Sequence, residues 1–480
     1  MSFSKGQIVK SFVWKLLERS GSQIVSFIVS IVLARLLEPS EYGIIGIITI
    51  FINLANVIID GGLNTAVVQK RDADNVDFST ILYFSLFLSG IVYFILYFSA
   101  PAIASFYNIK EIILVLRVLG LNLVFCAYNS IQRAYVSKYL LFNKLFWCSL
   151  IGVTVSGGIG IIMAYSGFGV WALVAQSMSY QILTTIVMSL IIKWKPIWIF
   201  STNRFKSLFD YGWKIFVTNF IIALYNDIRG ILIGKLYQPA SLAFFDRGKQ
   251  FPSLIMVNIN ASLQTILFPV LSEEQDHRDR VKSIMRRSTS LSCFFVFPLL
   301  VGLFVAARPL ILFLLTEKWL PVVPFMQIFC IAYLLMPMQI ANLEAIKSMG
   351  YSGITLKLEV IKKVIEAVIL IISFLIGIKA IAWGVVVYNT ICLVINLYPN
   401  IKLLNYKIAE QIKDVLPSFV ASVLMGLSVY WIQFIGIPVV FIILLQFLFG
   451  VLVYVGLCRL LRIESFVYLL DYIRQNKLKS

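Results

Sequence analysis

Residues 231–245 read ILIGKLYQPASLAFF, and residues 31–45 read IVLARLLEPSEYGII. The two stretches lie 200 residues apart, and at that spacing Pro39 matches Pro239. The match continues at the same spacing as far as Thr265, mainly through Phe, Leu and Val positions. Two successive matches at one spacing indicate an internal repeat. The chain is therefore predicted to contain two related halves.

The composition is that of a membrane protein. Apolar residues make up 60% of the chain, charged residues 13%, and the mean hydropathy is +0.90, whereas soluble domains carry about 25% charged residues. Apolar runs of about 20 residues satisfy their own backbone hydrogen bonds in a bilayer as helices, while barrel strands would show only about 10 alternating residues. The chain is thus predicted to be an all-α, polytopic membrane protein with about 14 transmembrane helices.

The repeat organises these helices into two six-helix lobes, predicted at residues 1–200 and 201–404. Because six spans separate Arg35 from its counterpart Lys235, both copies of the motif lie at the same face, which makes the repeat parallel. Residues 405–480 fall outside the repeat and are predicted to form helices 13 and 14 and an amphipathic tail on the inner surface. The last two helices could form a lipid-facing groove or a brace.

Lys and Arg set the orientation. About 31 of the 41 basic residues fall at the termini and in alternate loops, which predicts that both termini are cytoplasmic. The net charge of +18 then has its source in the inner loops, and no nucleic-acid partner is implied. The six cysteines show no metal-binding spacing and are expected to be small core residues.

Charge inside an apolar span points to a polar cavity. Asp227 and Arg229 lie within the run from Tyr211 to Tyr237, and an ionisable group at membrane depth costs about 2.5 to 3.5 kcal/mol unless a partner or water stabilises it. This run is therefore predicted to form one wall of a polar cavity in a transporter. The charged residues that follow it are Lys235, Asp246, Arg247 and Lys249.

Several segments together resemble a known family. They are ARLLEPSEYG (34–43), DGGLNTAVVQKRD (60–72), APAIASFY (100–107), FDRGKQFPSL (245–254), LFPVLSEEQDHRDRVK (267–282), LLTEKWLPVVPFMQIF (314–329) and NLEAIKSMGYSGITLKLEVIKK (342–363). From Ala34 onward the chain resembles bacterial polysaccharide flippases of the Wzx and teichuronic-acid exporter type. These belong to the multidrug/oligosaccharidyl-lipid/polysaccharide exporter superfamily.

The resemblance implies a carrier in the bacterial inner (plasma) membrane. It would move an undecaprenyl-pyrophosphate-linked oligosaccharide repeat unit from the inner to the outer leaflet by alternating access, for O-antigen, capsule or exopolysaccharide synthesis. Its partners would be the lipid-linked oligosaccharide and membrane lipids, with a polysaccharide polymerase and glycosyltransferases as further candidates. No cofactor is implied, and a proton or sodium gradient is a candidate energy source.

Such a cargo carries a polyanionic head, which cations in a low-dielectric, water-containing cleft attract. The predicted substrate-binding residues are Arg35, Arg229, Lys235, Arg247 and Lys249. Asp227 and Asp246 could hold those cations when the cavity is empty.

Each candidate has a structural alternative. Asp227 and Arg229 could form static bridges between helices, and Arg35 and Lys235 could extend to the outer interface. Asp60 could couple transport to protons, or serve as a hinge or cap near the inner helix end. For Glu344 and Glu366, near inner helix ends, coupling and simple solvation are both open.

Other function classes have weaker support. A drug or cation antiporter of the same superfamily would favour acidic cavity residues, and a membrane sugar polymerase or ligase would show a long outer loop. A lipid II flippase is harder to separate by charge alone. Asp72-Ala73-Asp74 resembles the DxD of glycosyltransferases, but it lies in a short loop, and the chain carries no Walker A, GxGxxG or HExxH motif. An enzyme is therefore not predicted.

Overall fold

The computed structural model describes residues 5–477, apart from the side chains of residues 5–9, 12, 16, 261, 262, 264–266 and 472–477. All regular elements in this range are helices. Those of the first half are α1 (Lys5–Leu36), α2 (Pro39–Asp60), α3 (Leu63–Gln69), α4 (Asn75–Tyr107), α5 (Glu111–Gly120), α6 (Asn122–Tyr139), α7 (Phe142–Tyr165), α8 (Val170–Ile192) and α9 (Thr202–Leu236). The remainder are α10 (Pro239–Glu273), α11 (Arg278–Val305), α12 (Ala307–Leu315), η1 (Glu317–Trp319), α13 (Val322–Leu334), α14 (Met336–Ser348), α15 (Ser352–Ile376), α16 (Ile378–Leu403), α17 (Ile408–Tyr430), η2 (Trp431–Phe434), α18 (Val439–Leu460) and α19 (Glu464–Lys477).

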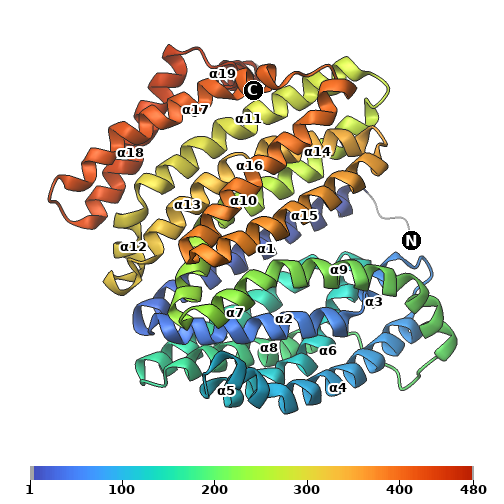
Figure 1. Cartoon of the computed structure of the whole chain (residues 1–480). Helices are drawn as coiled ribbons and strands as arrows, with labels where there is room; N and C mark the ends of the chain where they lie inside the picture. Colours follow the sequence, from blue (N-terminus) through green and yellow to red (C-terminus); the bar gives the residue numbers. More distant parts are fainter. Residues whose placement is uncertain (1–4, 478–480) are drawn as a thin grey trace. The chain divides into compact units, whose positions relative to one another are not determined.

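Internal contacts divide the chain into two compact units, Met1–Ala243 and Phe244–Ser480. This boundary differs from the lobe boundary at residue 200 because α9 packs along α2 and α3 (Figure 1). Glycines permit the contact: a Cβ on Gly234 would lie 2.9 Å from Ile47, and one on Gly62 would lie 2.2 Å from the carbonyl oxygen of Gly212. Small residues at such positions let helix backbones approach closely in a membrane. The assignment of lobes as moving bodies stays a prediction.

The repeat is visible in the backbone. Helices α1 and α9 end at Leu36 and Leu236, and the helices that follow them begin at Pro39 and Pro239. Proline suits the first position of a helix because its missing N–H would have no intrahelical partner there. In the first copy the preceding Glu38 forms a reciprocal capping box with Glu41, which fixes the start of α2.

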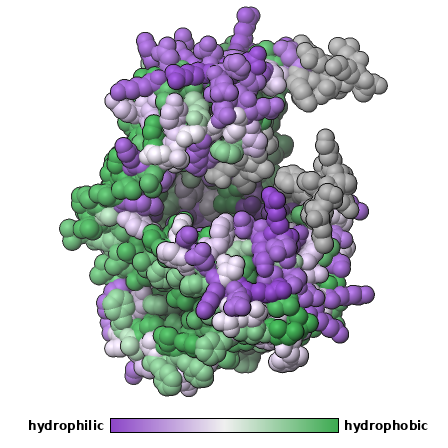
Figure 2. Space-filling view, turned by 90° about the vertical axis from the view of Figure 1, so that its right-hand side faces the viewer, coloured by the Kyte–Doolittle hydropathy of each residue, from purple (hydrophilic) through white to green (hydrophobic). Residues whose placement is uncertain are grey.

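Twelve helices in the described residues are long and apolar enough to cross a membrane. The two remaining long helices, α10 and α15, lie where the sequence predicts further spans, at about residues 244–271 and 358–376, so the count of 14 stays a prediction. Helix α15 buries several polar side chains and exposes apolar ones. Its buried residues include Lys362, Glu366 and Ser373, whereas Ile371 and Leu375 are exposed. Figure 2 shows broad hydrophobic areas on the surface beside areas where hydrophilic residues gather. This distribution suits a multi-pass membrane protein.

The first unit has two chemically distinct ends. At one end Lys235 of α9 donates a hydrogen bond to the carbonyl oxygen of Phe106 in α4. At the other end Lys138 of α6 bonds the carbonyl oxygen of Val68 (3.1 Å), and Trp194 donates to the side chain of Asn75 (3.1 Å). The links between successive helices therefore alternate between the ends, as the positive-inside pattern requires.

The connection between the halves is tethered to α4. The backbone N–H groups of Ile197 and Ser201 donate to the hydroxyls of Ser79 (3.0 Å) and Thr80 (3.2 Å). These hydroxyls are buried at the start of α4, so the segment before α9 is held by specific hydrogen bonds.

In the second unit a buried amide network joins three helices. The side-chain amide of Asn342 in α14 donates to Gln411 in α17 (2.9 Å), and that of Asn400 in α16 donates to Asn342 (2.8 Å). Helices α11 and α17 pack side by side (Figure 1). Phe294, Ala421 and Tyr454 belong to the apolar cluster that also holds α18 against α11.

Candidate functional site

A polar cavity of about 220 Å³ lies inside the first unit, between α2, α6 and α8. Its charged lining residues are Asp60 of α2 and Arg133 of α6. Asn56, Asn129 and Gln181 contribute amides to the same wall. These are candidate membrane-spanning helices, so the cavity places one acid, one base and several amides between helices that are apolar over most of their length.

Helical spacing explains how these residues meet. Asn56 and Asp60 are four residues apart on α2, and Asn129 and Arg133 are four residues apart on α6. Residues at i and i+4 lie on one face of a helix, one turn apart. Each helix therefore presents one amide and one charge toward the cavity.

A series of hydrogen bonds joins α6 to α8 around the cavity. The Asn129 amide donates to the Gln181 side chain (3.2 Å) and accepts from the hydroxyl of Thr185 (3.0 Å). One turn further, the Gln132 amide donates to the hydroxyl of Ser189 (3.2 Å). Interhelical hydrogen bonds of this kind hold membrane helices together at about 0.6 kcal/mol each on average. They also fix the directions in which the cavity amides point.

Asp60 has a clear structural role. It is the last residue of α2, and its carboxylate accepts a hydrogen bond from the side-chain amide of Asn64 in α3. Gly61 and Gly62 between them both adopt left-handed backbone conformations (φ 53° and 69°), which glycine tolerates without steric cost. Asp60 therefore links the end of α2 to α3 through the Asn64 side chain, while the hinge or cap role and proton coupling stay predictions.

Arg133 is the charged residue of the cavity whose hydrogen-bond donors are available to a ligand. Its side chain is exposed and makes no hydrogen bond or ion pair with another residue in the described part of the chain. A guanidinium carries five donors in a planar fork that matches phosphate oxygens. The neighbouring amides can both donate to and accept from hydroxyl groups. The cavity therefore offers donors suited to phosphate oxygens and partners for hydroxyl groups, beside the carboxylate of Asp60.

The predicted cations of the first unit lie at other positions. Arg35 is exposed in the last turn of α1. Lys235 is exposed and held in place, because its ammonium bonds the Phe106 carbonyl and lies 4.5 Å from the centroid of that ring. Asp227 and Arg229 are both half-buried within α9. The structure does not bring these four residues into the cavity around Asp60, and their roles stay predictions.

The remaining predicted cations belong to the second unit. Arg247 donates to the side chain of Gln250 (2.7 Å) and lies 5.8 Å from the ring centroid of Trp319. Asp246 and Lys249 on the same helix are exposed. A shared site formed by these residues and those of the first unit stays a prediction.

Glu344 and Glu366 are not simply solvated, which corrects one alternative. Both are buried in the second unit, at 5% and 7% exposure. Glu344 pairs with Lys347 at 2.9 Å, and Glu366 pairs with Lys363 at 2.8 Å. A buried charge needs such a partner because desolvation penalises it. Their role in coupling stays a prediction.

The last two transmembrane candidates border an apolar cavity. It measures about 560 Å³ and lies between α11, α17 and α18, with Pro298, Met425 and Phe447 among its lining residues. The groove alternative for residues 405–480 therefore has a physical counterpart within the second unit.

Sequence reasoning missed Arg133, Asn129 and Gln181 as site residues. The positive-inside count places Arg133 with the inner loop charges, although it lies within the span that the sequence predicts at about residues 112–135. The spacing of polar residues on α6 carried a usable signal, because Asn122, Asn129 and Arg133 follow one helical face at seven and four residues. Which helix lies opposite that stripe is decided by the tertiary structure.

A family model described as "Polysaccharide biosynthesis protein" matches residues 32–324, which is more than half of the chain. The chain belongs to the polysaccharide biosynthesis protein family. The predicted resemblance is therefore confirmed.

Three relatives illustrate this family. The teichuronic acid biosynthesis protein TuaB of Bacillus subtilis (strain 168) is 24% identical over 283 residues, which cover 58% of this chain and 59% of TuaB. The succinoglycan biosynthesis transport protein ExoT of Rhizobium meliloti (strain 1021) is 19% identical over 312 residues, 65% of this chain and 63% of ExoT. The lipopolysaccharide biosynthesis protein WzxC of Escherichia coli (strain K12) is 19% identical over 310 residues, 63% of this chain and 62% of WzxC. The matches span about three fifths of the length of these relatives.

Solved structures establish the fold. The lipid II flippase MurJ in an inward closed conformation superposes with a TM-score of 0.72 at 16% identity, over 96% of this chain and all (100%) of that chain. An inward-facing multidrug resistance transporter of the MATE family gives a TM-score of 0.61 at 15% identity, over 81% of this chain and 98% of that chain. The predicted all-helical, polytopic fold is thereby confirmed.

Proposed function

We propose that this protein is a flippase for undecaprenyl-pyrophosphate-linked oligosaccharides. It would translocate repeat units from the inner to the outer leaflet of the bacterial plasma membrane by alternating access, for surface polysaccharide synthesis. Family membership supports a role in polysaccharide biosynthesis. The observation that carries the proposal is the cavity lined by Arg133 and the amides of Asn129 and Gln181, because it offers donors for phosphate and partners for hydroxyl groups in one place.

Arg133 is assigned to the pyrophosphate and the amides to the sugar. A charge-assisted hydrogen bond contributes about 1.5 to 3 kcal/mol, more than a neutral one, so the phosphate contact would dominate the affinity. The hydroxyl contacts would orient the sugar, which differs between carriers of this kind.

The apolar tail of the cargo needs no polar site. Its head alone must cross a hydrocarbon layer about 30 Å thick, and the tail can stay in the bilayer or lie against the apolar cavity between α11, α17 and α18. Movement of the head would draw energy from a proton or sodium gradient. Both termini would be cytoplasmic. Glycosyltransferases would act before transport, and a polymerase would act after it.

The test replaces Arg133 with Gln in a strain whose own copy of the gene is deleted. Surface polysaccharide is expected to fall about tenfold or more, because one charge-assisted contact is lost, while the amount of protein in the membrane stays normal. Lipid-linked oligosaccharide should accumulate in the inner leaflet. The matched control is Arg71→Gln, which removes an exposed arginine outside the cavity.

Unchanged export by Arg133→Gln would remove this residue from the site. Two further outcomes identify other cargoes. Deletion that halts peptidoglycan synthesis, with normal surface polysaccharide, would indicate a lipid II flippase. Deletion that changes only sensitivity to cationic drugs would indicate an antiporter.

A further inference from the structure

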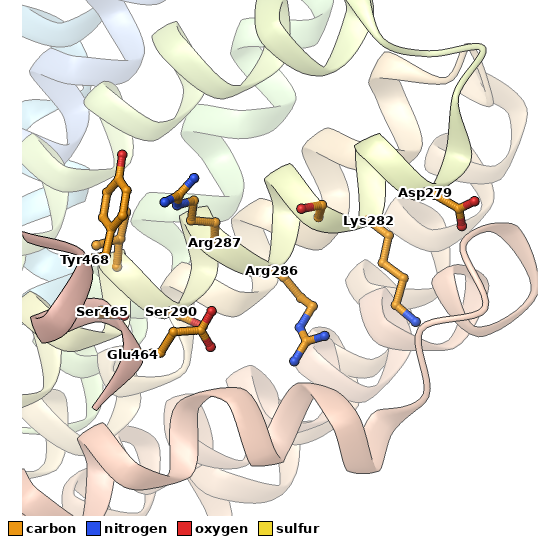
Figure 3. Close-up of a pocket in the computed structure, with 10 residues that line it drawn as sticks. Asp279, Lys282, Arg286, Arg287, Ser290, Glu464, Ser465 and Tyr468 are labelled. Atoms are coloured by element: carbon orange, nitrogen blue, oxygen red, sulfur yellow. The ribbon is translucent and has the colours of Figure 1, made fainter. Parts of the chain in front are cut away.

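A second polar cavity, of about 490 Å³, lies between α11 and the C-terminal helix α19 of the second unit (Figure 3). We call it the α11–α19 pocket and define it by Arg286, Arg287, Glu464, Ser465 and Tyr468. It lies at the end of α11 where this candidate membrane span begins. The proposed transport step does not involve this pocket.

Two cations of the pocket are already neutralised. Lys282 pairs with Glu410 at 3.0 Å, and Arg286 pairs with Asp414 at 2.5 Å. These pairs attach α11 to the start of α17. They are structural links and leave little charge for a ligand.

Arg287, the third cation of the pocket, has no acidic partner among the described residues. Its guanidinium lies 3.6 Å from the ring centroid of Tyr468, a stacking contact that leaves its in-plane donors available. Among the described residues it makes no ion pair or hydrogen bond. The hydroxyl of the buried Ser465 lines the same space. Together these groups offer one cation and one neutral donor to a phosphate.

An acid faces the same pocket from α19. Glu464 in the first turn of α19 is exposed, and within the described part of the chain it has no salt-bridge partner. Figure 3 shows its carboxylate directed into the space between the helices, away from Arg287. The charge of Glu464 also acts on Arg286, whose salt-bridge partner is Asp414. The pocket thus holds a cation, Arg287, and an acid, Glu464, that are not paired with each other. Asp279, on the first turn of α11, adds a second exposed acid at the far side.

An apolar cavity lies on another face of α11, between α11 and α10. This cavity of about 490 Å³ shares Leu291 with the α11–α19 pocket and is lined by Leu267, Ile284 and Phe295 among others. A lipid whose head occupies the pocket could place an acyl chain against the apolar surface of α11 near Leu291, whereas free phosphate and soluble zwitterions have no apolar part to make that contact. The exposed Val467 and Leu470 of α19 are typical of a helix that lies in the membrane interface.

We propose that the α11–α19 pocket binds a phospholipid with a primary ammonium in its headgroup. Arg287 and Ser465 hold the phosphate, Glu464 accepts hydrogen bonds from the ammonium, and an acyl chain follows α11 past Leu291. The bound lipid then links α19 to α11 at the end of the unit that is expected to face the cytoplasm. This site is independent of the transported cargo.

The test measures lipid retention by the full chain in detergent, using native mass spectrometry with phosphatidylethanolamine, phosphatidylcholine and phosphatidylglycerol. The wild type is expected to retain phosphatidylethanolamine best, because only its head carries both a phosphate and a hydrogen-bonding ammonium. Arg287→Gln should weaken binding of phosphatidylethanolamine and phosphatidylcholine about tenfold, since both share the phosphate contact. Glu464→Gln should lower phosphatidylethanolamine binding to the level of phosphatidylcholine.

The matched control is Arg278→Gln, which removes an exposed arginine from the same helix outside the pocket and should change nothing. Arg287→Lys keeps the charge and serves if Arg287→Gln does not fold; it should retain binding better than Gln. Equal retention of the three lipids by the wild type would overturn the proposal. So would wild-type retention by Arg287→Gln and Glu464→Gln, or displacement of the lipid by excess inorganic phosphate.

Discussion

Gly43 shows how closely the two copies of the repeat meet within the first unit. A Cβ at this position would lie 1.9 Å from the carbonyl oxygen of Pro239, the residue that matches Pro39 in the second copy. No real side chain fits at such a distance, and a backbone atom cannot move aside as a flexible side chain can. The start of α2 therefore requires glycine for a steric reason.

Gly43→Ala is expected to lower the free energy of unfolding by about 1 to 3 kcal/mol, as overpacking of a close contact does. Five of the six cysteines are buried, so a thiol-reactive fluorescent dye can follow thermal unfolding in detergent. Gly90→Ala is the control, because a Cβ there meets nothing within 4 Å; this change should be neutral or stabilising by about 0.4 to 1 kcal/mol. An unchanged melting temperature for Gly43→Ala would contradict the close contact.

A single substitution at Asp60 can distinguish a structural role of this residue from a role in proton coupling. Asn at this position can still accept the hydrogen bond from Asn64 but cannot bind a proton at neutral pH. If Asp60 couples transport to protons, Asp60→Asn should make transport in vesicles insensitive to an imposed proton gradient while the protein stays folded. Undiminished sensitivity would assign Asp60 to the helix cap alone.

At the scale of elements, an ion cluster holds the ends of three helices in the first unit together. Lys70, after α3, pairs with the buried Asp77 of α4 at 2.9 Å, and Arg204 of α9 reaches the same carboxylate at 3.3 Å. Asp74 caps α4 by accepting from the backbone N–H groups of Val76 (3.0 Å) and Asp77 (3.1 Å). The Asp72-Ala73-Asp74 motif is thereby explained as a helix start.

This cluster makes the stability depend on pH. The hydrogen bond from Arg204 lowers the pKa of the Asp74 carboxyl below its ordinary value. A lowered folded-state pKa stabilises the fold above about pH 4 and loses that contribution as the pH falls through the folded-state pKa. Arg204→Gln should therefore melt below the wild type at neutral pH, and the gap should shrink with acidification below about pH 4. Lys206→Gln, an exposed charge on the same helix turn, is the control. A gap that stays constant with pH would indicate that Arg204 acts only through packing.

At the scale of the molecule, the alternation of helix ends predicts which loops face outward. The turn at residues 166–169 joins α7 to α8, and a Cβ on its Gly169 would lie 2.4 Å from Glu41, so this turn shares an end with the start of α2. The loop at residues 274–277 joins α10 to α11 and belongs to the basic, inner set. With both termini cytoplasmic, the two loops lie on opposite sides of the membrane.

In a variant that lacks the native cysteines, Ser166→Cys should react with an impermeant maleimide on intact cells. Gln275→Cys should react only after the membrane is opened. Both positions are exposed, so access to the reagent depends on the side of the membrane. The reverse pattern would invert the orientation, and labelling of both on intact cells would contradict the alternation.

The sequence by itself determined the class of fold and predicted the repeat. Apolar length and the cost of unsatisfied backbone groups in a bilayer leave only helices, and Pro39 and Pro239 mark the starts of α2 and α10 through local backbone chemistry alone. These are properties of neighbouring residues, and a linear chain displays them.

Only the tertiary structure decided which polar groups share a space. It placed α9 on α2 through Gly234, buried Glu344 beside Lys347, and brought Arg133 of α6 to Asp60 of α2 across 73 positions of chain. A charge inside an apolar segment predicts that some partner or water is present but does not name it. The partner depends on which helix faces meet, and that is decided by packing over the whole unit.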